Sequence, residues 1–230
     1  ETYEVETLDN LEKIIQEKFH NHEWLWCRLK TGSGSKGATR VQNYEQALFW
    51  VKYWNEVRGI AIDQFLISEF LPGRDLAVQS TWKDGELKLM KIAERLSYYG
   101  GDARPSGMSS SPQLAKTIRD EEVLALCQRV AKTMDSKPNG NFNFDLKQNN
   151  NEEWCFTEVN IGRFCMITSI FDLTGKHSMI DTYIKLAFDE NVNIETPFDI
   201  EENRYLIREL DTEPLILTQD EIDSRVYTIN

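Results

Sequence analysis

Residues 141–164 read NFNFDLKQNNNEEWCFTEVNIGRF, and this stretch decides the fold class. Two runs rich in aromatic and β-branched residues, 141–146 and 153–159, flank a polar turn at 147–152, which predicts an antiparallel hairpin. On such a hairpin Asp145 and Glu158 can lie side by side on neighbouring strands. Asn160 shares a face with Glu158 because side chains alternate along a strand, and Arg163 follows three residues later.

Carboxylate and amide oxygens in this arrangement suit Mg²⁺ held between protein and nucleotide phosphates. An arginine beside them can reach the same phosphates or a charged intermediate. A solvated acidic hairpin without metal is the alternative, but the apolar neighbours at 154, 156 and 159 make an exposed charged surface less favoured. We therefore expect Asp145, Glu158 and Asn160 to be metal ligands and Arg163 to be a catalytic cation.

A glycine-rich segment, TGSGSKGATRV at 31–41, follows the basic strand WLWCRLK at 24–30. Glycines allow successive main-chain N–H groups to point at phosphate oxygens, and Lys36 can neutralise them. Arg28 and Lys30 lie two residues apart and so on one face of the incoming strand. No Walker motif occurs, and the glycines do not form a GxGxxG motif that precedes a helix in a parallel unit, so by itself a mobile connector is the commoner interpretation. The candidate nucleotide contacts are Arg28, Lys30, Ser33, Gly34, Ser35, Lys36 and Gly37.

The stretch ISEFLPGRDLAV, residues 67–78, reads as a strand that ends at a Pro-Gly turn. Main-chain groups at Glu69, Phe70 and Leu71 can hydrogen-bond a purine edge, and Asp75 can accept from ribose hydroxyls. An ordinary strand and turn is the alternative here.

The order of elements predicts an α+β fold. Apolar spacing and caps indicate helices beginning at Thr7 and Asn43 and helices over 112–134 and 179–188. Strands are expected over 23–29, 39–42, 65–71, 76–82, 87–95 and in a terminal pair within 204–218, with a loop at 97–112.

Composition excludes several classes of function. The 230 residues carry a net charge of −12, which argues against a nucleic-acid-binding surface. No apolar run approaches the roughly 20 residues that cross a bilayer. The four cysteines lack CxxC spacing and only three histidines occur, so we expect reduced thiols in a cytoplasmic protein without zinc.

Taken together, the three motifs resemble the ATP-grasp superfamily, most closely the carbamoyl-phosphate-synthase-like carboxylate–amine ligases, over about residues 1–190. WCRLKTGSGSKG matches the basic strand and flap, with Arg28 where the family has Lys or Arg. Glu69 to Asp75 match the adenine hinge. Asp145, Glu158, Asn160 and Arg163 match the last motif, although EVNIGR replaces E-[IVM]-N-P-R and adds one residue before the arginine.

The resemblance implies two α+β lobes with antiparallel sheets that grip a nucleotide. Residues 1–75 would be the small lobe with the flap, 76–190 the large lobe with the metal site, and 191–230 a tail with a strand pair. It also implies that a domain preceding these lobes in the family is missing from this sequence, which begins at ETYEV.

The activity implied is ATP- and Mg²⁺-dependent conversion of a small-molecule carboxylate to an acyl phosphate, which an amine or similar nucleophile then attacks. Arg28, Lys36 and Arg163 would stabilise the moving phosphoryl group. Arg95 and Arg104 flank the loop Tyr98-Tyr99-Gly-Gly and are candidates to hold an acidic substrate, with surface cations as the alternative. A nucleotide-binding module without turnover and an ATP-grasp kinase of a small molecule stay open.

Overall fold

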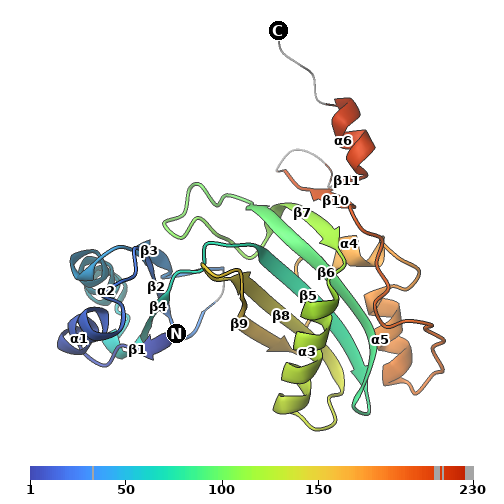
Figure 1. Ribbon diagram of the computed structural model, residues 1–230, viewed down its shortest axis with the longest axis horizontal. Coiled ribbons are helices and arrows are strands. Elements are labelled where there is room, and N and C mark those ends of the chain that lie inside the picture. Colours follow the sequence, from blue (N-terminus) through green and yellow to red (C-terminus); the bar gives the residue numbers. More distant parts are fainter. Residues whose placement is uncertain (33, 210–212, 214, 226–230) are drawn as a thin grey trace. The chain divides into compact units, whose positions relative to one another are not determined.

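The computed structural model describes residues 1–32, 34–209, 213 and 215–225, and the chain divides into two compact units. The first unit contains Glu1–Leu71 and Gly100–Ser110, and the second contains Pro72–Tyr99 and the described residues from Ser111 onward. The first unit thus ends at Leu71 rather than at residue 75, and it takes a segment from the middle of the chain. Each unit combines helices with an antiparallel sheet, which confirms the predicted α+β class (Figure 1).

In the first unit the described strands form a four-stranded sheet in the order β1-β4-β2-β3, with antiparallel pairing throughout. Its elements are β1 (Thr2–Glu4), α1 (Leu8–Lys18), β2 (Leu25–Leu29), β3 (Thr39–Val41), α2 (Tyr44–Arg58), the 3₁₀ turn η1 (Ile62–Gln64) and β4 (Phe65–Glu69). The strand β1 was not anticipated, because three residues carry too little pattern to be recognised.

Helices α1 and α2 pack on one face of this sheet. Thr7 accepts a hydrogen bond from the N–H of Asn10 at 3.1 Å, and Asn43 accepts one from the N–H of Gln46 at 3.0 Å, so both helices begin at the expected caps. The buried side chains of β2 at positions 25, 27 and 29 join the helices in one apolar core. The alternate positions of β2, 26 and 28, therefore lie on the opposite face.

In the second unit the described strands form a seven-stranded antiparallel sheet in the order β11-β10-β7-β6-β5-β8-β9. Its elements are β5 (Asp75–Lys83), β6 (Glu86–Tyr98), β7 (Pro112–Ile118), α3 (Glu121–Met134), β8 (Gly140–Gln148), β9 (Trp154–Ile161), α4 (Thr168–Asp172), α5 (Met179–Ala187), β10 (Tyr205–Ile207), β11 (Leu215–Leu217) and α6 (Gln219–Arg225). Strands β10 and β11 confirm the expected terminal pair.

Helices cover both faces of this sheet. Val123 and Cys127 of α3 pack with Leu76 and other even-numbered residues of β5, whereas α4 and α5 pack over the odd-numbered side, where Ala77 and Ala93 lie (Figure 1). The odd-numbered side of β5 also carries the polar residues described below, so small alanines and polar groups share that face.

The expectation of one helix over 112–134 is wrong. Residues 112–118 form β7, which is hydrogen-bonded between β6 and β10, and a separate helix begins after Asp120. The Asp120 side chain accepts from the N–H of Val123 at 3.0 Å, which is an N-cap interaction and sets the start of α3. Leu114 and Ile118 fit a helical spacing as well as a strand, so pairing with two neighbouring strands decided the outcome.

Candidate nucleotide and metal site

The hairpin of β8 and β9 carries the predicted metal ligands in the second unit. Asp145 lies directly opposite Glu158, and Asn143 lies directly opposite Asn160. Alternation along each strand places all four side chains on one face, with a register irregularity just after Asp145. The pairing of Asp145 with Glu158 is therefore as the sequence predicted.

Arg95 compensates the buried charge of Asp145. Its guanidinium donates through Nη2 to Oδ1 of Asp145, reaching across β5 at Ala77, which pairs with Asp145 on one side and with Ala93 on the other. Burial raises the pKa of Asp145, and Arg95 opposes this rise. Burial acts to lower the pKa of Arg95, but the nearby carboxylates hold it well above its usual value.

Asp75 is buried at the start of β5 and shares Arg95 with Asp145. Its Oδ1 accepts from Arg95 at 2.7 Å, and its Oδ2 accepts from the hydroxyl of Tyr98 at 2.5 Å and lies 3.5 Å from Nζ of Lys147. Burial, followed by the negative charge of Asp75, raises the pKa of Tyr98 far above its ordinary value. Both oxygens of this expected ribose acceptor thus have partners within the second unit.

Glu158 and Asn160 are more accessible and lie beside Arg163. The Glu158 side chain is 50% exposed, and its Oε1 lies 3.5 Å from Nη2 of Arg163. The same Nη2 donates to Oδ1 of Asn160. The extra residue in EVNIGR therefore does not keep Arg163 from the two expected ligands.

These side chains fit a magnesium ion in the chemistry of their donors. Among the described residues no cluster of three or more His, Cys, Asp or Glu could hold a metal ion unaided. Two facing carboxylates and neighbouring amide oxygens are nevertheless the partial, oxygen-only set that Mg²⁺ uses when phosphates and water complete its shell. Within the described part of the chain, Asn143 Oδ1 is buried and accepts no hydrogen bond, so an acceptor beside the carboxylates has no partner in the protein.

Sequence reasoning missed Asn143 and Gln79, which lie opposite each other on β8 and β5. Gln79 is fully buried; its Oε1 accepts from the Thr168 hydroxyl at 2.8 Å, and its Nε2 has no partner among the described residues. The period of two along NFNFD could have identified Asn143, which shares a face with Asp145. Gln79 lies in a strand distant in sequence, where no local pattern marks it.

In the first unit, Arg28 and Lys30 belong to the sheet face that α1 and α2 leave free. Arg28 lies opposite Leu66 on β4, and Lys30 forms an ion pair with Glu4 at 2.7 Å. The expected hinge begins at the end of β4 in the same unit. The ring of Phe70 lies 6.1 Å from the ring of Trp26, centroid to centroid, so aromatic surface accompanies the cations.

Two main-chain N–H groups of the expected hinge are already hydrogen-bonded within the first unit. The N–H of Glu69 donates to the carbonyl of Glu1 at 3.2 Å, and the N–H of Phe70 donates to the carbonyl of Trp24 at 3.3 Å. Leu71, the third expected hinge residue, is the last residue of this unit before Pro72.

The glycine loop joins β2 to β3, and Ser33 lies outside the described residues. Gly37 has φ +70°, and a Cβ there would lie 2.7 Å from Leu29 Cγ, so glycine is required at this position. The loop is anchored through its carbonyls. Trp50 Nε1 donates to Gly37 at 2.9 Å, and Arg104 Nη1 donates to Gly34 at 2.8 Å. Ser35 also has positive φ, and Lys36 is exposed.

Arg95 and Arg104, expected together as substrate ligands, lie in different units with different partners. Arg95 is 13% exposed and pairs with the carboxylates of the second unit, whereas Arg104 contacts the glycine loop of the first. Sequence proximity grouped them, but the chain passes from one unit to the other between these two residues.

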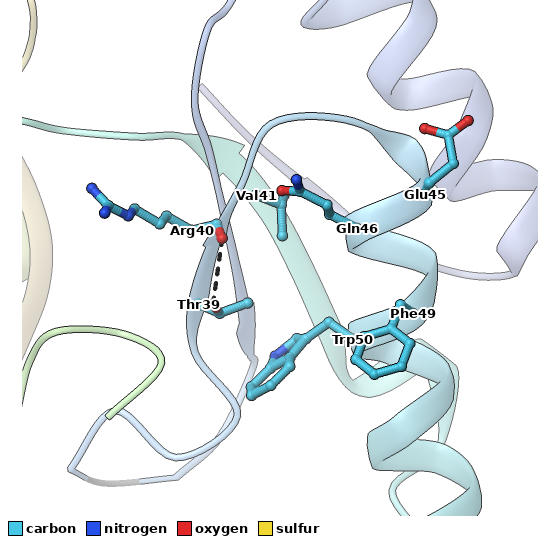
Figure 2. Close-up of a pocket in the computed structure, with 7 residues that line it drawn as sticks. All are labelled: Thr39, Arg40, Val41, Glu45, Gln46, Phe49 and Trp50. Carbon is cyan, nitrogen blue, oxygen red and sulfur yellow. Dashed lines mark hydrogen bonds between the residues drawn. The ribbon is translucent and has the colours of Figure 1, made fainter. Parts of the chain in front are cut away.

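A pocket of 360 Å³ lies between β3 and α2 (Figure 2). Trp50 points from α2 toward β3, and Arg40 points away from the helix. The Arg40 guanidinium lies 4.7 Å from the centroid of the Trp24 ring. This pocket contains no residue of the expected nucleotide or metal set.

Neither a protein-family model nor a curated protein sequence matches the chain. Solved structures do match. The biotin carboxylase domain of Hydrogenobacter thermophilus 2-oxoglutarate carboxylase, solved with MgADP, ADP and bicarbonate, superposes with a TM-score of 0.68 at 13% identity, covering 88% of this chain and 44% of that one. N5-carboxyaminoimidazole synthase of Aspergillus clavatus, solved with ADP and 5-aminoimidazole ribonucleotide, superposes with a TM-score of 0.65 at 14% identity, covering 90% of this chain and 51% of that one.

D-alanyl-alanine synthetase A of Vibrio cholerae is similar too, with a TM-score of 0.58 at 14% identity, covering 82% of this chain and 58% of that one. The chain thus spans about half the length of the structures it matches. No helix among the described residues is long and apolar enough to cross a membrane. The matched proteins are ATP-grasp enzymes, and the chain has the ATP-grasp fold.

Proposed function

We propose that the chain is the nucleotide- and metal-binding part of an ADP-forming ligase that activates a carboxylate for attack by an amine or similar nucleophile. The observation that supports this most is the register of β8 and β9, which sets Asp145 against Glu158, with Asn160 and Arg163 beside them. In-line phosphoryl transfer needs positioning and charge neutralisation more than covalent chemistry by the protein.

Asp145, Glu158 and Asn160 would hold the metal, with Asn143 as a further oxygen donor. When bound there, Mg²⁺ would neutralise phosphate oxygens and orient them. Arg163 can donate to the oxygens of the transferred phosphoryl group, because its guanidinium already lies beside Glu158 and Asn160.

The first unit would supply the nucleotide contacts. Arg28 provides a cation on the free face of the sheet, and Phe70 with Trp26 provides aromatic surface for a base. Lys36 is exposed on the glycine loop and can reach a phosphate group. Closure of this loop over the nucleotide would exclude water from the reacting groups. Arg95 is engaged by two buried carboxylates, so its proposed part is to hold Asp145 in place.

In the proposed reaction a carboxylate oxygen attacks the γ-phosphorus of ATP while the bond from phosphorus to ADP breaks. The nucleophile then attacks the acyl carbon, and inorganic phosphate leaves. Partners would be a small carboxylate and a small nucleophile. The matched structures contain bicarbonate in one case and 5-aminoimidazole ribonucleotide in another, which makes small anionic substrates the first to test.

The test has two stages on the purified chain. Calorimetry with MgADP comes first, and we expect a single saturable site that EDTA weakens. Incubation with MgATP, hydroxylamine and a panel of carboxylates comes second, and an acyl phosphate should yield a hydroxamate. Phosphorylated product without hydroxamate would favour the kinase alternative. MgADP binding without any ADP release would favour the non-catalytic module, and absence of MgADP binding would overturn the proposal.

A further inference from the structure

A second pocket of the first unit is lined by part of the glycine loop, including Lys36, and by residues of α2 to which the proposed reaction gives no role. It has a volume of 610 Å³ and lies among the glycine loop, helix α2 and the segment 100–110. A volume of this size suits a small organic ligand. Helix α2 packs on one face of the sheet, whereas Arg28 and Trp26 lie on the other, so this pocket is separate from the proposed nucleotide contacts on that face.

The charge around this pocket is positive. Of the described residues that line it, Lys36, Arg58 and Arg104 are cationic and none is acidic. The whole chain carries a net charge of −12, so a cluster of cations without a lining carboxylate differs in sign from the protein's net charge. Local cations of this kind attract an anion even on an acidic protein.

The wall of the pocket is aromatic. The rings of Trp50 and Tyr53 stack with centroids 6.1 Å apart and planes at 22°, and the ring of Trp54 lies 5.9 Å from that of Trp50. Arg58 lies over the Trp54 ring at 5.7 Å, so its charge is held beside the apolar wall. Flat apolar surface and positive charge are thus presented to the same cavity.

We propose that this pocket binds a small organic anion with a flat aromatic or apolar body. The ring of the ligand would pack against Trp50, Tyr53 and Trp54, and its carboxylate or phosphate would pair with Arg58, Arg104 and Lys36. Because Arg104 also donates to the carbonyl of Gly34, and Trp50 to that of Gly37, the ligand would contact the groups that anchor the glycine loop.

Titration with 2-naphthoate, 2-naphthyl phosphate and the neutral 2-naphthalenemethanol tests this proposal. Binding is followed by NMR of the indole N–H signals, with that of Trp54 assigned from the Trp54→Phe variant. Trp54 is informative because its ring lines the pocket and its buried Nε1–H has no partner among the described residues. We expect at least one anion to bind more than tenfold more tightly than the neutral alcohol and to shift the Trp54 signal.

Arg58→Ala should weaken anion binding about tenfold, while Arg129→Ala on α3, an exposed arginine outside the pocket, should not change it. A difference in affinity between 2-naphthoate and 2-naphthyl phosphate would show whether the pocket prefers a carboxylate or a phosphate.

The proposal is overturned if the neutral alcohol binds as well as both anions, if the Trp54 signal does not shift, or if Arg58→Ala has no effect on anion binding. A loss of MgADP affinity in Arg58→Ala equal to the loss for naphthoate would also overturn it, because the pocket would then belong to the nucleotide site. Failure of MgADP to bind at all would refute the proposed ligase and leave the naphthoate result standing.

Discussion

Arg95 on β6 pairs with Asp145 on β8 by reaching across the intervening strand at Ala77. The same guanidinium also pairs with Asp75, so one cation serves two buried carboxylates. The more buried of the two proposed carboxylate ligands, Asp145, is thus positioned by a residue that the motif itself does not contain.

Replacing Arg95 with Met should therefore destabilise the second unit severely. Removing one member of a buried ion pair typically costs about 3–5 kcal/mol, because the remaining charge is left uncompensated. Urea unfolding followed by circular dichroism measures the free energy of unfolding. Arg129→Met, at an exposed position of α3, is the control and should change it by less than about 0.5 kcal/mol. A loss below about 1 kcal/mol for Arg95→Met would refute the role assigned to this pair.

Glu158→Gln and Asn160→Ala should each weaken MgADP binding at least tenfold with little change in melting temperature. Glu158 is half exposed, so its charge contributes little to folding. Calorimetry gives the dissociation constant and differential scanning calorimetry the melting temperature. Glu122→Gln, at an exposed glutamate on the first turn of α3, is the matched control. A sharp fall in melting temperature, with MgADP affinity retained, would assign these residues a structural role instead.

Asn143→Ser should weaken MgADP binding while it leaves the stability of the ligand-free protein nearly unchanged. Asn143 Oδ1 is buried without a partner among the described residues, so its removal forfeits no hydrogen bond made through that atom. We expect the free energy of unfolding without ligand to change by less than about 1 kcal/mol. The rise in melting temperature caused by MgADP should shrink, since that rise follows ligand affinity. An unchanged MgADP-induced rise would exclude Asn143 from the site.

Lys91→Met should destabilise the fold without a specific effect on nucleotide binding. Lys91 is fully buried, and its ammonium donates to the carbonyls of Phe171 at 2.6 Å and Thr174 at 2.5 Å, at the end of α4. Burial lowers the pKa of this lysine, and the two carbonyls would lose their donor in the variant. Unsatisfied buried groups cost about 1–3 kcal/mol each. Lys88→Met, a partly exposed lysine on β6, should change the unfolding free energy far less.

The sequence by itself determined the hairpin. NFNFDLKQNNNEEWCFTEVN contains two strand-forming runs around one polar turn, so Asp145 and Glu158 could be assigned to neighbouring strands in advance. Their exact pairing depends on the register irregularity between Asp145 and Leu146, because the register of the pairs near the turn would set Asp145 opposite Thr157. The caps at Thr7 and Asn43 were equally readable, because a cap is a local hydrogen bond between residues three apart.

Only the tertiary structure decided what depends on residues distant in sequence. Residues 112–118 became a strand because β6 and β10 offered partners on both sides, although their spacing suited a helix. Arg95 and Arg104 are close in sequence, but one became the buried partner of Asp145 and the other an anchor of the glycine loop. Burial and long-range pairing of this kind leave no local pattern, which is why sequence reasoning placed Asp145 and Glu158 on one hairpin but missed Asn143, Gln79 and the pairing of Arg95.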